Sequence, residues 1–155
     1  RPLWGDGAAP TGGRFNPRGI PALYLGLSVI TAVKEASQGL SAKINPLVLC
    51  AYEIDSDDIL DLRDAATQGS VGTSDQDLAC PWLALPHAGR EPPTWTLSRQ
   101  LIGEGAAGVI VPSFAPGSTV DDANIVLWRW SDARPHFCAV HDPSGRLPKN
   151  QLSWS

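Results

Sequence analysis

A guanidinium, a phenol and a carboxylate lie within the first quarter of this chain, at Arg14, Tyr24 and Glu35. Arg14 belongs to the segment Gly-Gly-Arg-Phe-Asn-Pro-Arg-Gly (12–19), in which the glycines allow the backbone to come close to a ligand. A planar and permanently charged arginine suits a phosphate or a carboxylate, and the ring of Tyr24 could cover a flat heterocycle. These residue types, so close together, favour a nucleotide site.

Each of the three residues also has a simpler interpretation. Arg14 could be a loop cation bound to carbonyl oxygens, and Tyr24 could be a core aromatic residue of a strand. Glu35 falls at the border of the apolar face of its expected helix, where a carboxylate is most often solvated. Their occurrence in one loop–strand–helix unit is the reason to prefer the functional interpretation.

The elements that must position these residues alternate between strands and helices. Strands are expected over 22–26, 47–54, 59–62, 107–111, 124–130 and 136–141, and helices after Ser28, after Ser74 and around 95–102. The run 47–54 is continuously apolar, which is typical of a strand at the centre of a sheet. In the helix that holds Glu35, Ser28 fits an N-cap and Gly39 ends the helix. The apolar residues that share one face of this helix are Val29, Ala32, Val33 and Ala36.

Composition limits the class of protein. The 155 residues, 43% of them hydrophobic, fit one domain over 1–155 with a core of its own. A net charge of −4 argues against a nucleic-acid surface, since such a surface needs a concentrated basic face. No apolar run approaches the length of a membrane span and no export signal follows Arg1, so we expect a cytoplasmic protein without a membrane partner. The sequence contains no Met, which leaves open a leader that has been removed.

Two local patterns do not support the chemistry that they first suggest. Residues 103–108 match the Gly-x-Gly-x-x-Gly pattern of dinucleotide-binding folds, but the helical pattern precedes them and the β-branched run 109–111 follows. That order is the reverse of the one that binds a pyrophosphate, so the glycines are expected to end a helix and lead into a strand. The segment His136–His141 holds too few ligands for a structural zinc site, and we expect a strand with a buried Cys138 and no metal. The spacing of Cys50, Cys80 and Cys138 fits reduced thiols.

Ser113 follows the expected strand 107–111 through Pro112. Its hydroxyl is thereby placed at a strand end, where sites are often built. Serine after proline is also ordinary loop chemistry, so this position alone indicates little.

Taken in order, several segments resemble the RES-domain family, which is named for Arg, Glu and Ser. They are Gly-Gly-Arg-Phe-Asn-Pro-Arg-Gly (12–19), Leu-Tyr-Leu (23–25), Ala-Val-Lys-Glu (32–35), Gly-Val-Ile-Val-Pro-Ser (108–113) and Asn-Ile-Val-Leu-Trp (124–128). The resemblance implies an α+β domain with an ADP-ribosyltransferase-like fold, a central split or mixed sheet and flanking helices. It also implies a toxin of a bacterial type II toxin–antitoxin pair that consumes NAD.

The resemblance assigns the namesake catalytic residues to Arg14, Glu35 and Ser113. It implies NAD-binding roles for Arg14, Phe15, Asn16, Tyr24 and Ser113. The chain departs from the family's pattern at Phe15, where Trp is usual, and at Phe114-Ala115, where a basic or polar residue is often found.

Cleavage of the nicotinamide–ribose bond suits these residue types. A carboxylate stabilises the oxocarbenium-like transition state, so Glu35 is the candidate for that role. Arg14 would bind the pyrophosphate, Tyr24 would stack on nicotinamide, and Ser113 would hydrogen-bond Glu35 or the ribose. We expect transfer of ADP-ribose to a protein, with NAD as the substrate.

Three other functions stay open at this stage. The same chemistry could deplete NAD by hydrolysis or phosphorolysis, because water or phosphate can capture the same cation. A nucleotide-binding module without catalysis, and an interaction domain that uses its six Trp residues as anchors, are the alternatives from other classes. For an NAD-consuming toxin, the resemblance implies a helix-turn-helix antitoxin that covers the Arg14/Tyr24 cleft.

Overall fold

The computed structural model describes residues 3–37, 48–145 and 147. Its helices are η1 (Gly5–Ala8), α1 (Val29–Ser37), α2 (Ala65–Ser70), α3 (Asp75–Leu78), α4 (Ala84–His87) and α5 (Pro93–Gly103). Its strands are β1 (Leu23–Gly26), β2 (Ala51–Ser56), β3 (Ile59–Asp61), β4 (Gly108–Pro112), β5 (Ala123–Leu127) and β6 (His136–His141). None of the helices in these residues is long and apolar enough to cross a membrane.

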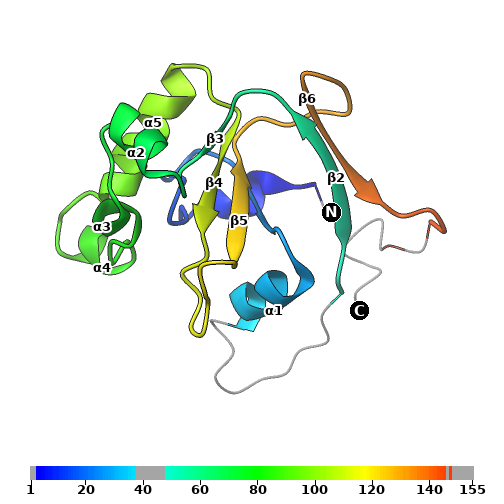
Figure 1. Ribbon diagram of the computed structural model, residues 1–155, viewed down its shortest axis with the longest axis horizontal. Coiled ribbons are helices and arrows are strands. Elements are labelled where there is room, and N and C mark those ends of the chain that lie inside the picture. Colours follow the sequence, from blue (N-terminus) through cyan, green and yellow to red (C-terminus); the bar gives the residue numbers. More distant parts are fainter. Residues whose placement is uncertain (1–2, 38–47, 146, 148–155) are drawn as a thin grey trace.

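The strands form two sheets, as Figure 1 shows. The larger sheet has the order β1-β5-β4-β3, in which β3 and β4 are parallel and the other pairs are antiparallel. The smaller sheet pairs β2 with β6 in antiparallel register. The expected α+β class with a split, mixed sheet is therefore confirmed.

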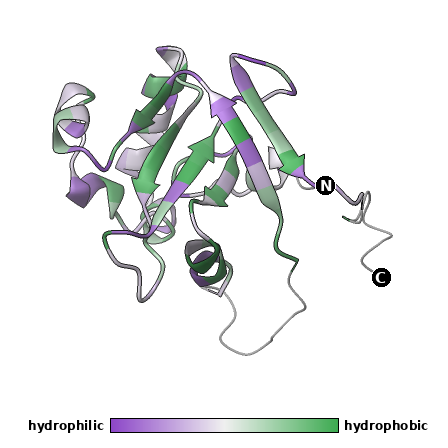
Figure 2. Ribbon diagram, turned by 45° about the vertical axis from the view of Figure 1, so that its right-hand side comes forward, coloured by the Kyte–Doolittle hydropathy of each residue, from purple (hydrophilic) through white to green (hydrophobic). Residues whose placement is uncertain are grey.

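Alternating residues of the central strands pack into two separate cores. Val109, Val111 and Val126 face a core built with Phe15 and with α5, whereas Ile125 and Leu127 face a second core shared with the smaller sheet. All five residues of β5 are buried, which identifies β5 as a central strand of the molecule. Hydrophobic residues accordingly run along the inner strands in Figure 2.

The position of the segment 47–54 was predicted wrongly. Within its described part only residues 51–54 are in a strand; they belong to β2, which lies in the two-stranded sheet and alternates between exposed and half-buried side chains. The apolar residues before it, Val48 and Leu49, precede the strand and are exposed. Residue 47 lies outside the described residues. Val48, Leu49 and Cys50 instead line a hollow beside β1 and α1, so the apolar run is not a strand buried on both faces.

Helix α1 begins where the sequence predicts, because Ser28 Oγ accepts a hydrogen bond from the Thr31 amide at 3.0 Å. The face that it buries is different from the expected one, since Thr31 is the one fully buried residue of α1, while Val29 is 60% and Val33 49% exposed. The helix therefore turns its polar side, which includes Glu35, toward the sheet. Its predicted end at Gly39 lies outside the described residues.

The glycine-rich segment 103–108 behaves as predicted. Helix α5 ends at Gly103, Gly105 has a φ of +97°, and β4 begins at Gly108. An added Cβ at Gly108 would lie 2.3 Å from the carbonyl oxygen of Val126, so only glycine lets β4 approach β5 at this point. Cys138 is buried in β6, as expected, and all three cysteines are free.

Candidate functional site

A cavity of about 350 Å³ lies between the loop that holds Arg14, the start of β1, helix α1 and the ends of β4 and β5. Its lining is mostly apolar and contains one cation and one carboxylate. The residues that line it are Gly13, Arg14, Phe15, Tyr24, Glu35, Trp82, Val111, Pro112, Phe114, Asn124 and Val126. The fold thus brings Arg14, Tyr24 and Glu35 to one cavity of a size that suits a small-molecule ligand.

Glu35 is held by two donors on the sheet. Its Oε1 atom accepts a hydrogen bond from Ser113 Oγ at 2.6 Å and another from Asn124 Nδ2 at 2.5 Å. The expected contact between Ser113 and Glu35 is therefore present. Two donors on one oxygen fix the direction of the carboxylate toward the cavity.

Ser113 lies behind Glu35 and outside the lining of the cavity, with only 8% of its surface exposed. Its own hydroxyl is positioned by Ser118 Oγ, which donates a hydrogen bond to it at 2.8 Å. Its amide donates to the Asp122 carbonyl at 2.8 Å, which extends the pairing of β4 with β5 by one more residue. Ser113 thus contacts Glu35, which lines the cavity, and does not line the cavity itself.

The guanidinium of Arg14 is oriented by backbone and by an aromatic ring. Its Nη1 donates hydrogen bonds to the carbonyls of Cys80 at 2.6 Å and Leu78 at 3.2 Å, and its Cζ lies 4.4 Å from the centre of the Phe114 ring. Burial lowers the pKa of Arg14, and the nearby Cys80 and Glu35 act in the opposite direction. The simpler interpretation of Arg14, a cation bound to carbonyls, is therefore correct for one edge of the guanidinium. The same residue also lines the cavity.

Phe114 lies in the loop that departs from the family's pattern and contacts the guanidinium of Arg14. The aromatic ring supports the arginine through a cation–π contact. The centre of its ring lies 6.3 Å from the centre of the Phe15 ring. Phe15 is 3% exposed and packs into the core beside the cavity. The site therefore has an apolar floor under its one cation.

Tyr24 combines a fixed hydroxyl with an accessible ring. The hydroxyl donates to Asn16 Oδ1 at 2.6 Å and accepts from the Phe15 amide at 2.9 Å, while 40% of the residue is exposed. Burial of the hydroxyl is the main cause that raises the pKa of Tyr24 far above its usual value, so the phenol stays protonated as a donor. A ring held in this way could stack on a heterocycle at little entropic cost.

Asn16 is fully buried and lies outside the lining of the cavity. Its Nδ2 donates to the carbonyls of Ala8 and Ile20, and its Oδ1 accepts from Tyr24. The resemblance implies an NAD-binding role for Asn16, and in the structure its amide shapes the loop around Arg14. Asn16 is therefore connected to the cavity through the hydroxyl of Tyr24.

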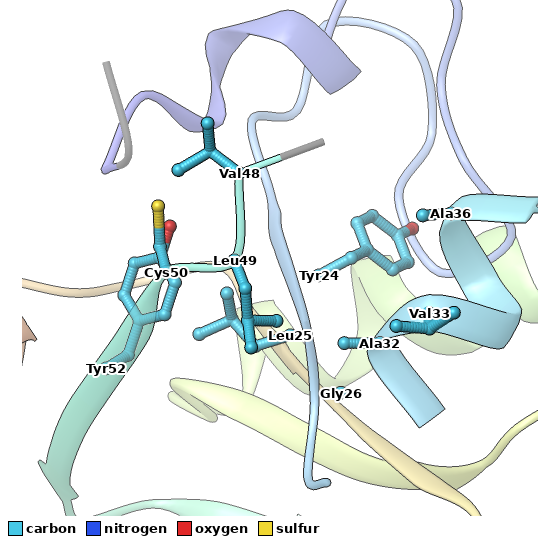
Figure 3. A pocket seen from close by; sticks show the side chains of 10 residues that line it. All are labelled: Tyr24, Leu25, Gly26, Ala32, Val33, Ala36, Val48, Leu49, Cys50 and Tyr52. Atoms are coloured by element: carbon cyan, nitrogen blue, oxygen red, sulfur yellow. The ribbon is translucent and has the colours of Figure 1, made fainter. Parts of the chain in front are cut away.

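A second hollow of about 450 Å³ lies on the other side of Tyr24, between β1, α1 and the segment that leads into β2. Figure 3 shows the ring of Tyr24 beside Val33 and Ala36, with Cys50 and Tyr52 across the hollow. Its walls are predominantly apolar side chains. Tyr24 lines both hollows, which is why its ring is exposed although its hydroxyl is tied down.

Asn124 and Trp82 are among the residues of the site that were not predicted from the sequence. Asn124 is a polar residue in the otherwise apolar strand β5, and this contrast is the signal that could have identified it. Trp82 lines the cavity from the turn after α3, where nothing in the pattern marks its contact. Within the residues that the structure describes, no group of three or more His, Cys, Asp or Glu side chains could hold a metal ion.

Comparison with known proteins gives a family match and structural matches. The model of the RES domain family matches residues 1–150. A chain of the crystal structure of the M. tuberculosis MbcT–MbcA toxin–antitoxin complex is similar in fold, with a TM-score of 0.61 and 23% sequence identity. The match covers 92% of the present chain and 75% of that chain. A search of curated proteins gives no match.

Proposed function

Because the chain belongs to the RES domain family, we propose that it is the toxin of a toxin–antitoxin pair and that it acts on NAD. The proposed reaction cleaves the bond between nicotinamide and ribose and transfers ADP-ribose to a protein. The observation that supports it best is the carboxylate of Glu35, which Ser113 and Asn124 hold toward a cavity that also contains Arg14.

In the proposed reaction the C–N glycosidic bond breaks and its electron pair leaves with the nicotinamide nitrogen, so nicotinamide departs as a neutral molecule. Positive charge develops on the ribose, where Glu35 stabilises it. A nucleophile of the acceptor protein then bonds to the ribose carbon and loses a proton. Arg14 offers its charge to the pyrophosphate, and the exposed ring of Tyr24 stacks on the nicotinamide.

Stabilisation by Glu35 requires that the carboxylate keep its direction while the substrate changes charge. A preorganised group does not have to reorient during the reaction, which makes its electrostatic effect larger than that of a mobile one. The apolar walls formed by Phe114 and Val111 reduce screening by water in the same cavity. These features favour catalysis over a module that only binds a nucleotide.

Release of nicotinamide tests the proposal directly. The purified protein is incubated with NAD, with and without cell extract, and nicotinamide is followed by chromatography. Release that requires extract, together with labelling of a protein by radioactive NAD, is the expected result. Release without extract would replace transfer by hydrolysis, and release only with added phosphate would replace it by phosphorolysis. No release under any condition would contradict the proposal and favour the binding module.

For partners, we propose a cognate antitoxin of the helix-turn-helix class that covers the cavity inside the cell that makes both proteins. The similar fold found in a toxin–antitoxin complex supports a partner of this kind. The test expresses the chain with and without the adjacent open reading frame and measures growth and cellular NAD. Arrest that the second protein relieves is expected, whereas harmless expression of the chain alone, with NAD unchanged, would contradict the toxin assignment.

A further inference from the structure

Helix α1 holds Glu35 over the cavity, and polar contacts join it to β5 and to the loop between β4 and β5. Among its residues only Thr31 is fully buried, and the apolar Val29 and Ile30 are 60% and 66% exposed. Figure 1 shows α1 beyond the ends of β4 and β5, not packed flat against a sheet face. Apolar burial alone therefore does not fix the helix, and a specific contact must set the position of Glu35.

That contact is made by Asp122, in the loop between β4 and β5. Its Oδ1 accepts a hydrogen bond from Thr31 Oγ1 at 2.8 Å, and its Oδ2 accepts one from Lys34 Nζ at 2.7 Å. The same Oδ2 accepts from the Thr119 amide at 2.8 Å. Only 6% of Asp122 is exposed, so one buried carboxylate joins α1 to its own loop.

The backbone of Asp122 contacts the other partner of Glu35. Its carbonyl accepts the hydrogen bond of the Ser113 amide at 2.8 Å. Asn124, which also holds Glu35, follows two residues later in the chain. Asp122 thus contacts α1 through its side chain and Ser113 through its backbone, and it lies two residues before Asn124.

Thr31 and Glu35 are four residues apart on α1 and therefore share one face of the helix. Fixing Thr31 against Asp122 sets both the rotation of α1 about its axis and its height over the sheet. Lys34, the residue before Glu35, is fixed to the same carboxylate. Because Thr31 and Lys34 are both bound to Asp122, the last turn of α1 before Glu35 is fixed, and the Glu35 carboxylate is directed at Ser113 and Asn124.

We propose that Asp122 is the positioning residue for Glu35: through Thr31 and Lys34 it holds α1 in the register that places the Glu35 carboxylate on Ser113 and Asn124. This inference rests on the proposed function, because it assigns Asp122 to the same reaction. Asp122 touches no substrate in this role. It acts on the rate of bond cleavage and not on the affinity for NAD.

Asp122→Asn keeps the size of the side chain but replaces one of its two oxygens by an amide nitrogen. That nitrogen cannot accept the hydrogen bond from Thr31 or from Lys34 that the oxygen accepts. We expect kcat for nicotinamide release to fall about tenfold to a hundredfold, since a shift of about 1 Å in a reacting group has effects of that order. We expect KM for NAD to stay within about twofold at a temperature where the melting curve shows a folded protein. Asp121→Asn is the matched control, because it removes an exposed carboxylate from the adjacent position and should leave kcat unchanged.

A second pair of variants tests the same contact from the helix. Thr31→Val removes the hydroxyl at constant shape, whereas Thr31→Ser keeps it. The proposal expects the loss of kcat in Thr31→Val and its recovery in Thr31→Ser, with KM constant in both. Equal loss in the two variants, or a rise of KM at constant kcat, would overturn it in favour of a general packing role.

Crystal structures of the variants separate this inference from the proposed function. In Asp122→Asn we expect the Glu35–Ser113 distance to exceed about 3.5 Å, the limit of a hydrogen bond, while Asp121→Asn keeps it. If the unmodified protein releases no nicotinamide, the proposed function fails, and this distance still decides the positioning role. An unchanged distance in Asp122→Asn refutes that role whatever the activity.

Discussion

Glu35 and Asn124 meet at 2.5 Å across the end of the larger sheet, where Asn124 Nδ2 donates to the oxygen that also accepts from Ser113. The pairing of β4 with β5 sets Asn124 opposite Val111, two residues before Ser113. The backbone ladder thus determines the spacing of the two donors, and the helix supplies the acceptor. Strands are more rigid than loops, so this arrangement presents the carboxylate in a defined direction.

Replacing Glu35 by Gln should lower kcat for nicotinamide release by at least about a hundredfold, since it removes the charge that opposes the developing cation. The dissociation constant for NAD should change little, because this charge matters chiefly in the transition state. Single-turnover kinetics and calorimetric titration with NAD measure the two quantities. Glu53→Gln, at an exposed position of β2, is the matched control and should behave as the unmodified protein. Near-normal cleavage by the Glu35 variant would show that its assigned role is wrong.

The two donors to Glu35 should each contribute less than the charge that they orient. Ser113→Ala and Asn124→Ala should each lower kcat about tenfold, the effect of one hydrogen bond to a charged group. The double variant should lose more than the product of the two, because each remaining donor compensates for the other. Asn124→Asp should be worse than Asn124→Ala, since it places a second carboxylate within hydrogen-bond distance of Glu35. Full activity in either alanine variant would remove that residue from the site.

The sequence was most informative where local chemistry decides local structure. The N-cap at Ser28, the helix that begins after Ser74 and the glycines that end α5 follow from side-chain and backbone preferences within a few residues. The unit of Arg14, Tyr24 and Glu35 could be recognised for the same reason, since its members lie close in the chain. Their meeting in one cavity is a property of the fold and is visible only in the structure.

The prediction failed where tertiary contacts override the pattern. The apolar stripe of α1 predicted that Val29 and Val33 face the core, but the contacts of Thr31 and Lys34 with the buried Asp122 carboxylate turn the polar face inward. A contact between residues so far apart in sequence leaves no periodic signal. Asn16 shows a related point, because a residue that the resemblance assigns to NAD binding also shapes the loop through its own hydrogen bonds. The role of each predicted site residue in binding or catalysis stays a prediction.

Replacing Gly13 by Ala should disrupt the loop that presents Arg14. An added Cβ would lie 2.6 Å from both Asn16 Oδ1 and the Tyr24 hydroxyl, which are hydrogen-bonded to each other. We expect a loss of about 1 to 3 kcal/mol in the free energy of unfolding, typical of overpacking, together with weaker binding of NAD. Denaturant unfolding and titration with NAD measure the two effects. Gly7→Ala, where a Cβ meets nothing within 4 Å, is the control, and equal effects in the two variants would contradict this account.

The carboxylate of Asp122 should make stability depend on pH in the acid range. Hydrogen bonds from Lys34, from the Thr119 amide and from Thr31, in this order of effect, hold the pKa of Asp122 far below its usual value. The unfolded chain has a pKa of about 3.9 at this residue, so between the two values the unfolded state binds more protons than the folded state. The stabilisation is therefore fully present well above pH 4 and is lost as the pH falls through the lower value of the folded protein.

Comparison of the unmodified protein with Asp122→Asn isolates this contribution. The difference in free energy of unfolding between the two should be constant from about pH 6 to 8 and should shrink as the pH falls below about 4, because protonated Asp122 then resembles the amide. Urea unfolding over a series of pH values measures it. Asp121→Asn controls for the change in net charge and should differ less from the unmodified protein at neutral pH. A difference for Asp122→Asn that grows toward low pH would have the opposite sign and would exclude a native carboxylate stabilised by Lys34 and Thr31.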